Sequence, residues 1–495
     1  MLAWSIYISF IGAALVALVP GEKPALARVI ALATALLGLV VTLVAIAQRE
    51  ATATLRDIVN VPWISGIGAN YHLAADGISV ALLLLTGIAA IAGVLFSWNI
   101  EKRVNQFFAL YLTLIGGVYG VFLSFDLFLL FVFYEIAIIP KYFLIAIWGS
   151  TNKEYGAMKL ALYSFVGSAM VMIGLIAAYV VAGASTFDLL TLARHPFPYS
   201  FQLWAFPLVF IGFAILAGLW PFHTWAPTGH VAAPTAASML LAGVVMKLGA
   251  YGALRVAMTL FPHGLAAWRD EIGLLAVIGI VYGAGVALVQ KDFKFVIGYS
   301  SVSHMGFVLL GMMTLSIVGL SGAVLQMFSH GIISGLLFAV VGRMVYDRAH
   351  TRELTELEGM SLARALPFAA VTFVLASVAS MGMPGFSGFV AELQVLLGAW
   401  KVFPVYTMLA GLGILIGVAY TLRALVKAFF GNAEAPAAAG HGEGLAAISL
   451  PERIGAVMLL AITLLIGIYP RLLLDLIIPS FETPLMQSLV KGVRP

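Results

Sequence analysis

Fourteen segments of this sequence are long and apolar enough to cross a lipid bilayer, and this feature decides the fold class. A membrane-spanning helix needs about 20 predominantly apolar residues, and such segments follow one another with mostly short connections between residues 2 and 478. Only 10% of the residues are charged, whereas soluble domains contain about 25%. The sequence therefore predicts an all-α integral membrane protein of about 14 transmembrane helices. The expected ranges are 2–19, 26–47, 77–97, 106–123, 126–148, 158–182, 205–219, 235–259, 272–289, 295–314, 317–346, 366–400, 404–430 and 453–478.

Two connections are longer than the others. Residues 48–76 are expected to contain a small hairpin around Gly66–Gly68, and residues 431–452 form a loop rich in Ala and Gly. The loops after odd-numbered helices hold fourteen Lys and Arg residues, and the loops after even-numbered helices hold five. Because cytoplasmic loops carry an excess of basic residues, we expect the odd loops in the cytoplasm and both termini on the other side.

The composition excludes several classes of function. The chain has no cysteine, so it can form neither disulfides nor cysteine-ligated iron–sulfur clusters. No Gly-rich phosphate loop follows a strand-like segment, so nothing supports nucleotide hydrolysis. The formal charge is only +4 without a clustered basic face for nucleic acid. No histidine spacing matches a metal site, and we expect neither a cofactor nor a metal in this chain.

Two of the expected helices are broken. The helix of residues 205–219 ends in a break at Trp220–Pro234, and five helices later the helix of residues 366–400 is interrupted around Pro384. Because five is an odd number, the second set of helices would lie inverted relative to the first. Matched broken helices in inverted halves indicate a transport site, so we expect helices 4–8 and 9–13 to form inverted five-helix repeats. The expected domains are 1–105 (helices 1–3), 106–260 (first repeat), 261–430 (second repeat) and 431–495 (loop, helix 14 and tail).

Lys247 lies near the middle of the apolar helix that follows the first break. A lysine at the bilayer centre costs about 3 kcal/mol or more, and such a residue indicates a functional site. Since a desolvated lysine can bind and release a proton near neutral pH, Lys247 is expected to carry protons. The alternative is a structural lysine that donates to backbone carbonyls at the helix break.

Glu135 and Lys141 share one otherwise apolar helix. Glu135 is expected to hold a proton under the control of a nearby cation; the alternative is a structural carboxylate that ties two helices together. The two residues point about 240° apart on a straight helix, so they face each other only if Pro140 bends it. The alternative for Lys141 is that it extends to the membrane interface. Arg423 is a further charged residue within an expected span.

Glu392 follows the second break and mirrors Lys247 in the other half of the chain. The alternative is a helix-end carboxylate that faces solvent. His304 and His330 lie on consecutive helices between them, with several serines nearby. Because histidine titrates near neutrality, the pair could connect Lys247 to Glu392 through water; the alternative is two satisfied core histidines.

Four more residues mark the breaks themselves. His223, Pro227 and His230 belong to the first break, and Pro384 belongs to the second. We expect these residues to shape or gate the breaks.

Five segments carry distinctive motifs: FVFYEIAIIPKYFLIAIWG, WPFHTWAPTGHVAAPTAASMLLAGVVMKLGAYG, QKDFKFVIGYSSVSHMGFVLLG, QMFSHGIISGLLF and GMPGFSGFVAEL. Together they resemble the antiporter-like membrane subunits of respiratory complex I (NADH:quinone oxidoreductase), above all the M subunit. The resemblance covers about residues 70–430 and implies fourteen helices with two inverted repeats, each a proton half-channel. It implies roles in proton translocation for Glu135, Lys247, His304, His330 and Glu392. A glutamate at position 392 favours the M subunit, because sister subunits and cation/proton antiporter subunits tend to have lysine there.

The chain departs from the family pattern at the first break. The positions of the family's helix-seven lysine and the following proline are Leu216 and Gly218, and Thr228 replaces an acid. The family usually has an apolar residue where Lys141 stands. We hypothesise that Lys141 replaces the missing lysine as the partner of Glu135.

The resemblance implies a proton-translocating membrane subunit of a complex I-type NADH:quinone oxidoreductase, a non-redox subunit of a translocase enzyme. It places NADH, flavin, iron–sulfur clusters and quinone in other subunits. The expected partners are L- and N-type antiporter-like subunits on the flanks and small K-, J- and A-type subunits. The expected location is the bacterial inner (cytoplasmic) membrane or an equivalent energy-transducing membrane. The alternatives are an Mrp-type cation/proton antiporter subunit, a membrane subunit of a membrane-bound hydrogenase complex, and a structural spacer without conduction.

Overall fold

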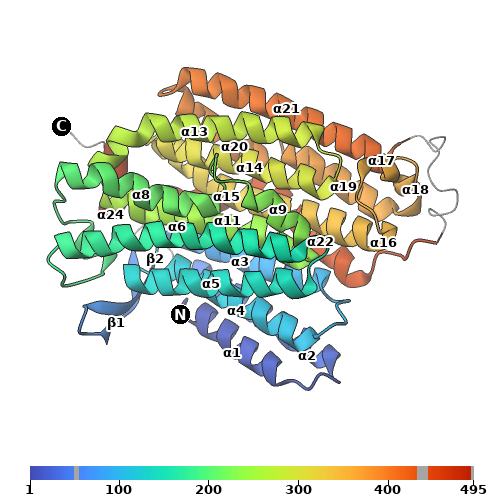
Figure 1. Ribbon diagram of the computed structural model, residues 1–495, viewed down its shortest axis with the longest axis horizontal. Helices are drawn as coiled ribbons and strands as arrows, with labels where there is room; N and C mark the ends of the chain where they lie inside the picture. The colour runs from blue at the N-terminus through green and yellow to red at the C-terminus, as the bar shows by residue number, and fades with distance from the viewer. Residues whose placement is uncertain (49–54, 432–443, 492–495) are drawn as a thin grey trace.

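The computed structural model describes residues 1–48, 55–431 and 444–491. Long helices run side by side, with a β-hairpin at one end of the bundle and α16–α18 at the other (Figure 1). We call these the hairpin end and the opposite end. The helices are α1 (Trp4–Leu18), α2 (Pro24–Ala47), α3 (Gly77–Phe96), α4 (Val104–Leu123), α5 (Leu127–Trp148), α6 (Lys153–Val181), α7 (Leu189–Leu192), α8 (Tyr199–Ala217), α9 (Trp225–Ala232), α10 (Thr235–Leu240), η1 (Leu241–Val245), α11 (Met246–Gly252), η2 (Ala253–Ala257), α12 (Met258–Leu260), α13 (Pro262–Val289), α14 (Phe293–Met313), α15 (Ile317–Phe338), η3 (Ala339–Tyr346), α16 (Asp347–Ala349), α17 (Leu354–Leu357), α18 (Leu362–Ala365), α19 (Pro367–Ser380), α20 (Ser387–Trp400), α21 (Pro404–Phe429), α22 (Leu450–Ile468), α23 (Arg471–Ser480) and α24 (Pro484–Lys491), where η denotes a π-helix. The strands are β1 (Arg56–Ile64) and β2 (Ala69–Ala75).

The described residues supply the expected fourteen spans. Twelve helical stretches are long and apolar enough to cross a membrane. The other two are α1 and the broken pair α19 and α20, which are shorter. The all-α membrane fold with about 14 spans is therefore confirmed.

Several boundaries were wrong: α6 and α8 begin at Lys153 and Tyr199, five and six residues before the expected starts, and two larger differences have a clear physical reason. Helix α13 begins at Pro262, ten residues before the expected start, because a proline at the first helical position favours initiation and the polar first turns hide the periodicity. The expected helix 453–478 is two helices, since α22 ends at Ile468 and α23 begins after Pro470. A proline disfavours the helical conformation of the residue before it.

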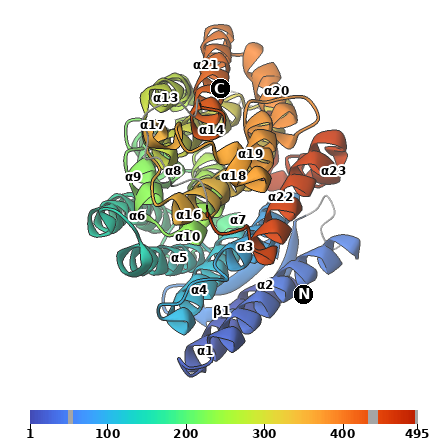
Figure 2. The ribbon, with the colours of Figure 1, turned by 90° about the vertical axis from the view of Figure 1, so that its right-hand side faces the viewer.

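Three stretches form the centre of the bundle. Helix α3, the segment Thr235–Leu260 and the segment Ile317–Ala349 are buried along nearly their whole length. By contrast, only about a third of the residues in the most apolar stretches of α2, α21 and α22 are buried within the chain. Seen from the opposite end, α1 and α2 and then α21–α23 lie at the margins of the bundle (Figure 2). Any polar group on the central segments must therefore find its partner inside the protein.

Both predicted breaks are present. Helix α8 ends at Gly218, which has a φ of 85°, and a turn leads to the short helix α9. Helix α19 ends before Gly382 and Gly385, whose φ values are 74° and 99°. Glycine adopts these left-handed conformations without steric cost, so the glycines permit the two helices to stop inside the bundle.

The backbone repeats one junction at both ends of the bundle. At the hairpin end, the N–H of Leu127 donates to Phe187 and the N–H of Leu189 donates to Phe125, each over 2.8 Å. At the opposite end, the N–H of Phe293 donates to Arg352 and the N–H of Leu354 donates to Lys291, again over 2.8 Å. The first junction opens α5 and the second opens α14, five spans later. The inverted five-helix repeats are thus visible in the backbone, while the exact domain boundaries remain a prediction.

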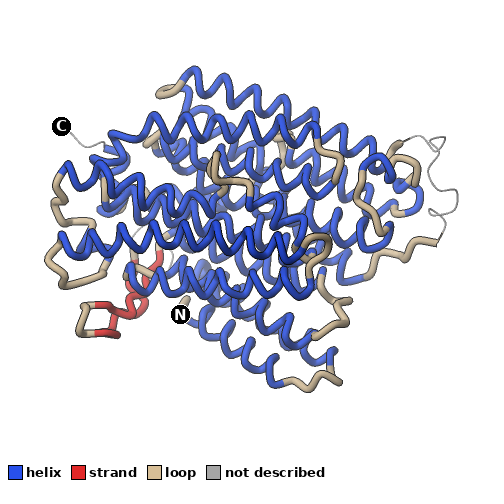
Figure 3. The backbone as a smooth tube through the Cα atoms, in the orientation of Figure 1, coloured by secondary structure: helices blue, strands red, loops and turns tan. Residues whose placement is uncertain are grey.

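The hairpin expected around Gly66–Gly68 is present, with β1 and β2 antiparallel (Figure 3). It is tied to the bundle because Asn70 N–H donates to the Asp126 carboxylate over 2.9 Å and Phe125 N–H donates to the His72 carbonyl over 3.0 Å. Asp126 also caps α5 by accepting from the N–H groups of Phe128 and Leu129. The hairpin therefore rests on the start of the helix that carries Glu135. The other expected loop, 431–452, lies largely outside the described residues.

A buried histidine clamps this hairpin. His72 Nδ1 lies 2.7 Å from Asp188 Oδ2, and His72 Nε2 lies 2.9 Å from Asp57 Oδ1. Burial lowers the pKa of His72, but the hydrogen bonds to Asp188 and Asp57 outweigh it and raise the pKa above 6.5. Both ring nitrogens can donate only in the protonated imidazolium form.

We predict that the hairpin loosens as the pH rises. A raised folded-state pKa means that the clamp contributes fully below 6.5 and is lost as the pH passes the folded value. Hydrogen exchange of β1 and β2, corrected for the intrinsic effect of pH, should therefore show less protection in alkaline buffer. His72→Gln should remove this pH dependence, at a cost of about 1.5–3 kcal/mol for the charged hydrogen bond to Asp188.

His195→Gln is the matched control, since the His195 ring packs on Phe197 at the same end of the bundle. Unchanged pH dependence in the His72→Gln variant would show that the clamp does not depend on this ring.

Candidate functional site

Lys247 is the second residue after a π-helix. The segment η1 (Leu241–Val245) directly precedes it, and Lys247 donates a hydrogen bond to the Ala242 carbonyl at its start. A π-helix shifts the backbone hydrogen-bond pattern and occurs often at functional sites. The Lys247 side chain has no exposed surface. A purely structural lysine would make this hydrogen bond to a carbonyl, but Lys247 also has a second hydrogen-bond partner.

Lys247 also contacts His330. The Lys247 Nζ lies 2.7 Å from His330 Nδ1, a strong hydrogen bond between α11 and α15. The ring of His330 lies 5.4 Å from that of His304 on α14, centroid to centroid. His304 Nδ1 in turn lies 3.0 Å from the Glu392 carboxylate on α20. Four of the predicted residues are thus brought into one line across four helices.

A small polar cavity joins the two histidines. It has a volume of about 10 Å³, and His304, His330 and Glu392 line it together with the side chains of Ser300, Gln326, Ser329, Ser334 and Ser380. A cavity of this size holds about one water molecule. His330 Nε2 is buried, and no other group of the described chain accepts from it or donates to it. A water in the cavity could therefore complete a hydrogen-bonded path from His330 to His304.

Glu392 is not the solvent-facing carboxylate of the alternative interpretation. Its side chain is nearly buried, and Gln326 Nε2 donates to it over 3.2 Å. The hydroxyl of Ser380 lies 3.3 Å from His304 Nε2. Gln326 and Ser380 complete this end of the line, and nothing in the sequence pattern distinguishes them from other polar residues in apolar helices. Their positions on the inner faces of α15 and α19 were readable from the sequence, but their partners were not.

Glu135 and Lys141 form a separate cluster on α5. Lys141 is 1% exposed, so it lies inside the protein and does not extend to the membrane interface. The two charges are close enough to interact electrostatically, and Ser168 of α6 lies beside Glu135. The Lys141 Nζ has no hydrogen-bond partner within the described ranges. No hydrogen bond between described residues joins this cluster to Lys247.

The residues of the breaks lie at several positions. His230 is buried against the ring of Phe338, and neither of its nitrogens has a partner in the described chain. His223 packs edge-on against Tyr282. Pro227 presses on Gly298 of α14, where an added Cβ would lie 2.9 Å from its Cα. Pro384 is exposed in the turn between α19 and α20.

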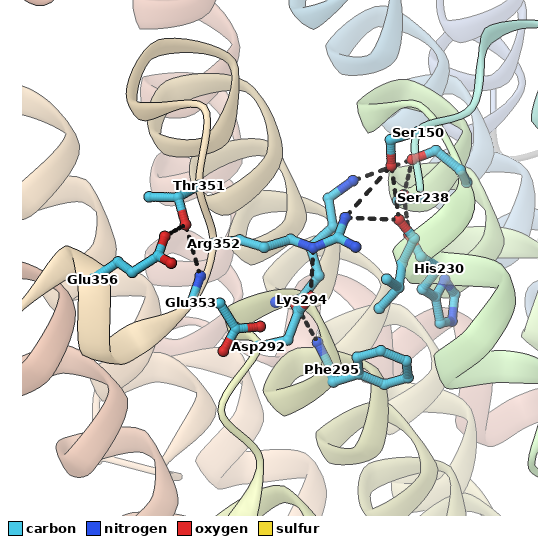
Figure 4. A network of polar contacts seen from close by, with 12 residues as sticks. Ser150, His230, Ser238, Asp292, Lys294, Phe295, Thr351, Arg352, Glu353 and Glu356 are labelled. Carbon is cyan, nitrogen blue, oxygen red and sulfur yellow. Dashed lines mark hydrogen bonds and ion pairs between the residues drawn. The ribbon is translucent and has the colours of Figure 1, made fainter. Parts of the chain in front are cut away.

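Arg352 holds the first break at the opposite end. It pairs with Asp292 over 2.5 Å and donates to the Val231 carbonyl over 3.2 Å (Figure 4). Lys294 donates to the Ala233 carbonyl over 3.1 Å, and Ser238 donates to the His230 carbonyl over 2.7 Å. These bonds satisfy carbonyls that the break leaves without helical partners. Arg423 does the same for α13, since it donates to the carbonyls of Leu288 and Gln290.

Similarity to known proteins covers most of this chain. The profile of a family described as NADH:quinone oxidoreductase/Mrp antiporter, transmembrane, matches residues 124–417. NADH-quinone oxidoreductase subunit M of Rhodobacter capsulatus is 38% identical over 434 residues, covering 84% of this chain and 82% of that protein. Subunit M of Pseudomonas aeruginosa is 36% identical over 498 residues, covering 96% of each.

Two solved structures share the fold. A chain of respiratory complex I from Thermus thermophilus with bound NADH superposes with a TM-score of 0.88 at 27% identity, covering 100% of both chains. A chain of the Mrp complex from Dietzia sp. DQ12-45-1b gives a TM-score of 0.86 at 20% identity, covering 99% of both. The second likeness, at its low identity, concerns the fold alone.

We predict that His330→Leu destabilises the protein through Lys247. Removing the partner of a buried donor costs about 1–3 kcal/mol, measured by denaturant unfolding in detergent. In a double-mutant cycle with Lys247→Met, the second substitution should cost less once the first is present, because the contact is already lost. Ser334→Ala, which lines the same cavity, is the control. Additive effects of the two substitutions would contradict the contact.

Proposed function

Because the chain belongs to the family of NADH:quinone oxidoreductase/Mrp antiporter transmembrane subunits, we propose that it translocates protons through the line Lys247, His330, His304 and Glu392. Its relatives are named as subunit M of NADH-quinone oxidoreductase, and we assign this chain the same place in such a complex. The observation that carries the proposal is the hydrogen bond of 2.7 Å between Lys247 and His330 together with that of 3.0 Å between His304 and Glu392. A small cavity lies between the two pairs.

The proton moves in short steps. The Lys247 ammonium donates to neutral His330 Nδ1, and the same hydrogen bond leaves a neutral amine when the proton crosses it. His330 then releases a proton from Nε2 towards the cavity, and His304 passes one to Glu392 through its contact with the carboxylate. Each step needs groups about 2.6–3.2 Å apart, directly or through one water. The amine is then reprotonated from the opposite end, where a cavity of about 180 Å³ is lined by Lys294 and Thr235.

The pair of Glu135 and Lys141 controls when Lys247 releases its proton. We propose that redox energy released elsewhere in the complex changes the distance between Glu135 and Lys141. The changed electrostatic field at Lys247 then drives its proton towards His330. In this chain Lys141 replaces the lysine that the family has where Leu216 stands. Tyr134, the neighbour of Glu135, packs against Phe213 of α8 with ring centroids 5.6 Å apart. Since Leu216 is three residues beyond Phe213, it shares that face of α8, so a lysine at either position would lie near α5.

The partners follow from the same assignment. The exposed apolar faces of α2, α21 and α22 suit sister antiporter-like subunits of L and N type, small K-, J- and A-type subunits, or lipid. The oxidation of NADH and the reduction of quinone take place in other subunits, and this chain contributes no redox group. We place it in the bacterial inner membrane, with the opposite end towards the cytoplasm.

We predict that Lys247→Ala uncouples the subunit. General acid–base groups contribute roughly 10²-fold or more to proton-transfer rates, so proton pumping per NADH oxidised should fall in liposomes that contain the assembled complex. Lys401→Ala removes an exposed lysine from a surface turn and should pump normally. Full pumping by Lys247→Ala at normal assembly would favour a structural spacer.

We predict that a lysine at position 216 of α8 can replace Lys141 of α5. Lys141→Met should lower pumping, because Glu135 loses its cation. Adding Leu216→Lys to that variant should restore pumping, while Leu216→Lys alone serves as the control for an added charge. Normal pumping by Lys141→Met would refute the replacement, and so would a double variant that assembles without recovery.

A further inference from the structure

A second buried charged pair lies two turns beyond Lys247 on the same segment. The Arg255 guanidinium of η2 contacts the Asp76 carboxylate over 2.7 Å, and both side chains are 1% exposed. Asp76 also caps α3 by accepting from Ser79 N–H over 3.0 Å. A buried ion pair is costly to desolvate and rarely adds net stability over apolar packing. The proposed relay does not use this pair.

The pair lies on a polar stripe that begins at Lys247. The residues Lys247, Tyr251, Arg255 and Thr259 are spaced by four, and residues with this spacing lie on one face of a helix. The Tyr251 hydroxyl donates to the Phe122 carbonyl over 3.0 Å and lies 3.2 Å from the Ser79 hydroxyl. The stripe thus continues from the central lysine towards the hairpin end.

The stripe ends at a cavity. Thr259 lines a cavity of about 480 Å³ at the hairpin end, together with the exposed residues Arg194 and Glu482. The segment of Lys247 therefore has a cavity near each of its ends, because Lys294 and Thr235 line the cavity at the opposite end.

The cations on the two sides of Lys247 differ in chemistry. Lys294 is an amine, which can release a proton and bind another. Arg255 stays protonated in proteins and cannot relay a proton. A fixed guanidinium in a narrow route instead repels protons, as arginines do in selective pores. Arg255 is held in place by the rings of Phe125 and Tyr251, 5.1 and 5.3 Å from its central carbon.

Only one of the two carboxylate oxygens of Asp76 accepts a hydrogen bond from a described residue. Its Oδ1 accepts from both Ser79 and Arg255, while its buried Oδ2 has no partner within the residues that the structure describes. A buried oxygen without a hydrogen bond costs free energy. Asp76 accepts from Ser79, whose hydroxyl contacts that of Tyr251. The Asp76 carboxylate can therefore accept a proton as soon as the Arg255 guanidinium moves away.

We propose that the ion pair of Asp76 and Arg255 is the closed gate of a proton route from Lys247 to the cavity at the hairpin end. The inference rests on the proposed function, in which Lys247 carries the proton. With the pair closed, the lysine exchanges protons only with the histidine line and the opposite end. When the pair separates, the Lys247 ammonium loses its proton towards Tyr251 and Ser79, and the neutral amine is reprotonated from the other side.

The test is the passive proton leak of liposomes that contain the assembled complex, without NADH. Arg255→Gln removes the fixed charge and should raise the leak several-fold, whereas Arg255→Lys keeps a cation and should leak less than Arg255→Gln. The double variant Lys247→Ala/Arg255→Gln should return the leak to the parental level, because the route begins at Lys247. No increase with Arg255→Gln, or an increase that persists in the double variant, overturns the gate.

Asp76→Asn is the second variant, in case Arg255→Gln does not assemble. An asparagine keeps the helix cap and an acceptor for Arg255, but it weakens the pair. The leak should rise here as well, and a parental leak from the assembled variant overturns the gate. The loss of pumping in Lys247→Ala tests the proposed function separately, so a failed gate leaves that result intact.

Discussion

The structure depends on one constraint, namely that an amine at the centre of a membrane protein must have polar partners inside the protein. Lys247 has no exposed surface, and its segment is buried along its whole length. The π-helix before it supplies a carbonyl, and His330 supplies a ring nitrogen. The ring of His330 lies 5.4 Å from that of His304, and His304 and Gln326 both contact the Glu392 carboxylate. The polar line thus begins at one buried lysine and extends through buried polar side chains to Glu392.

The broken helices create a second demand of the same kind. A helix that stops inside the bundle leaves carbonyl and N–H groups without helical partners. Arg352, Lys294 and Ser238 satisfy carbonyls at the first break. The junctions that open α5 and α14 use the same pair of backbone bonds at opposite ends of the bundle. The inverted repeat therefore appears in the backbone hydrogen bonds, and an aspartate, Asp126 or Asp292, caps the helix at each junction.

Much of the architecture could be predicted from the sequence, because apolar length alone defines a span and a cluster of glycines and prolines marks a break. The starts of α13 and α23 could not be placed in this way, because prolines at 262 and 470 override the apolar pattern. Each of the four residues in the line from Lys247 to Glu392 was predicted as a proton-carrying group, but their order and contacts were not. The pair of Asp76 and Arg255 escaped notice because an arginine near a helix end is usually exposed to solvent, and its burial depends on α3 packing beside it.

The sequence by itself determined which residues lie in the membrane, where the helices break and which ionisable groups are stranded among apolar neighbours. These properties are local, since each depends on the composition of one segment. The tertiary structure alone decided that Lys247 reaches His330, that Lys141 is enclosed instead of facing lipid, and that Arg255 meets Asp76. Those contacts join residues far apart in the chain, and only the packing of helices against one another brings their side chains within hydrogen-bonding distance.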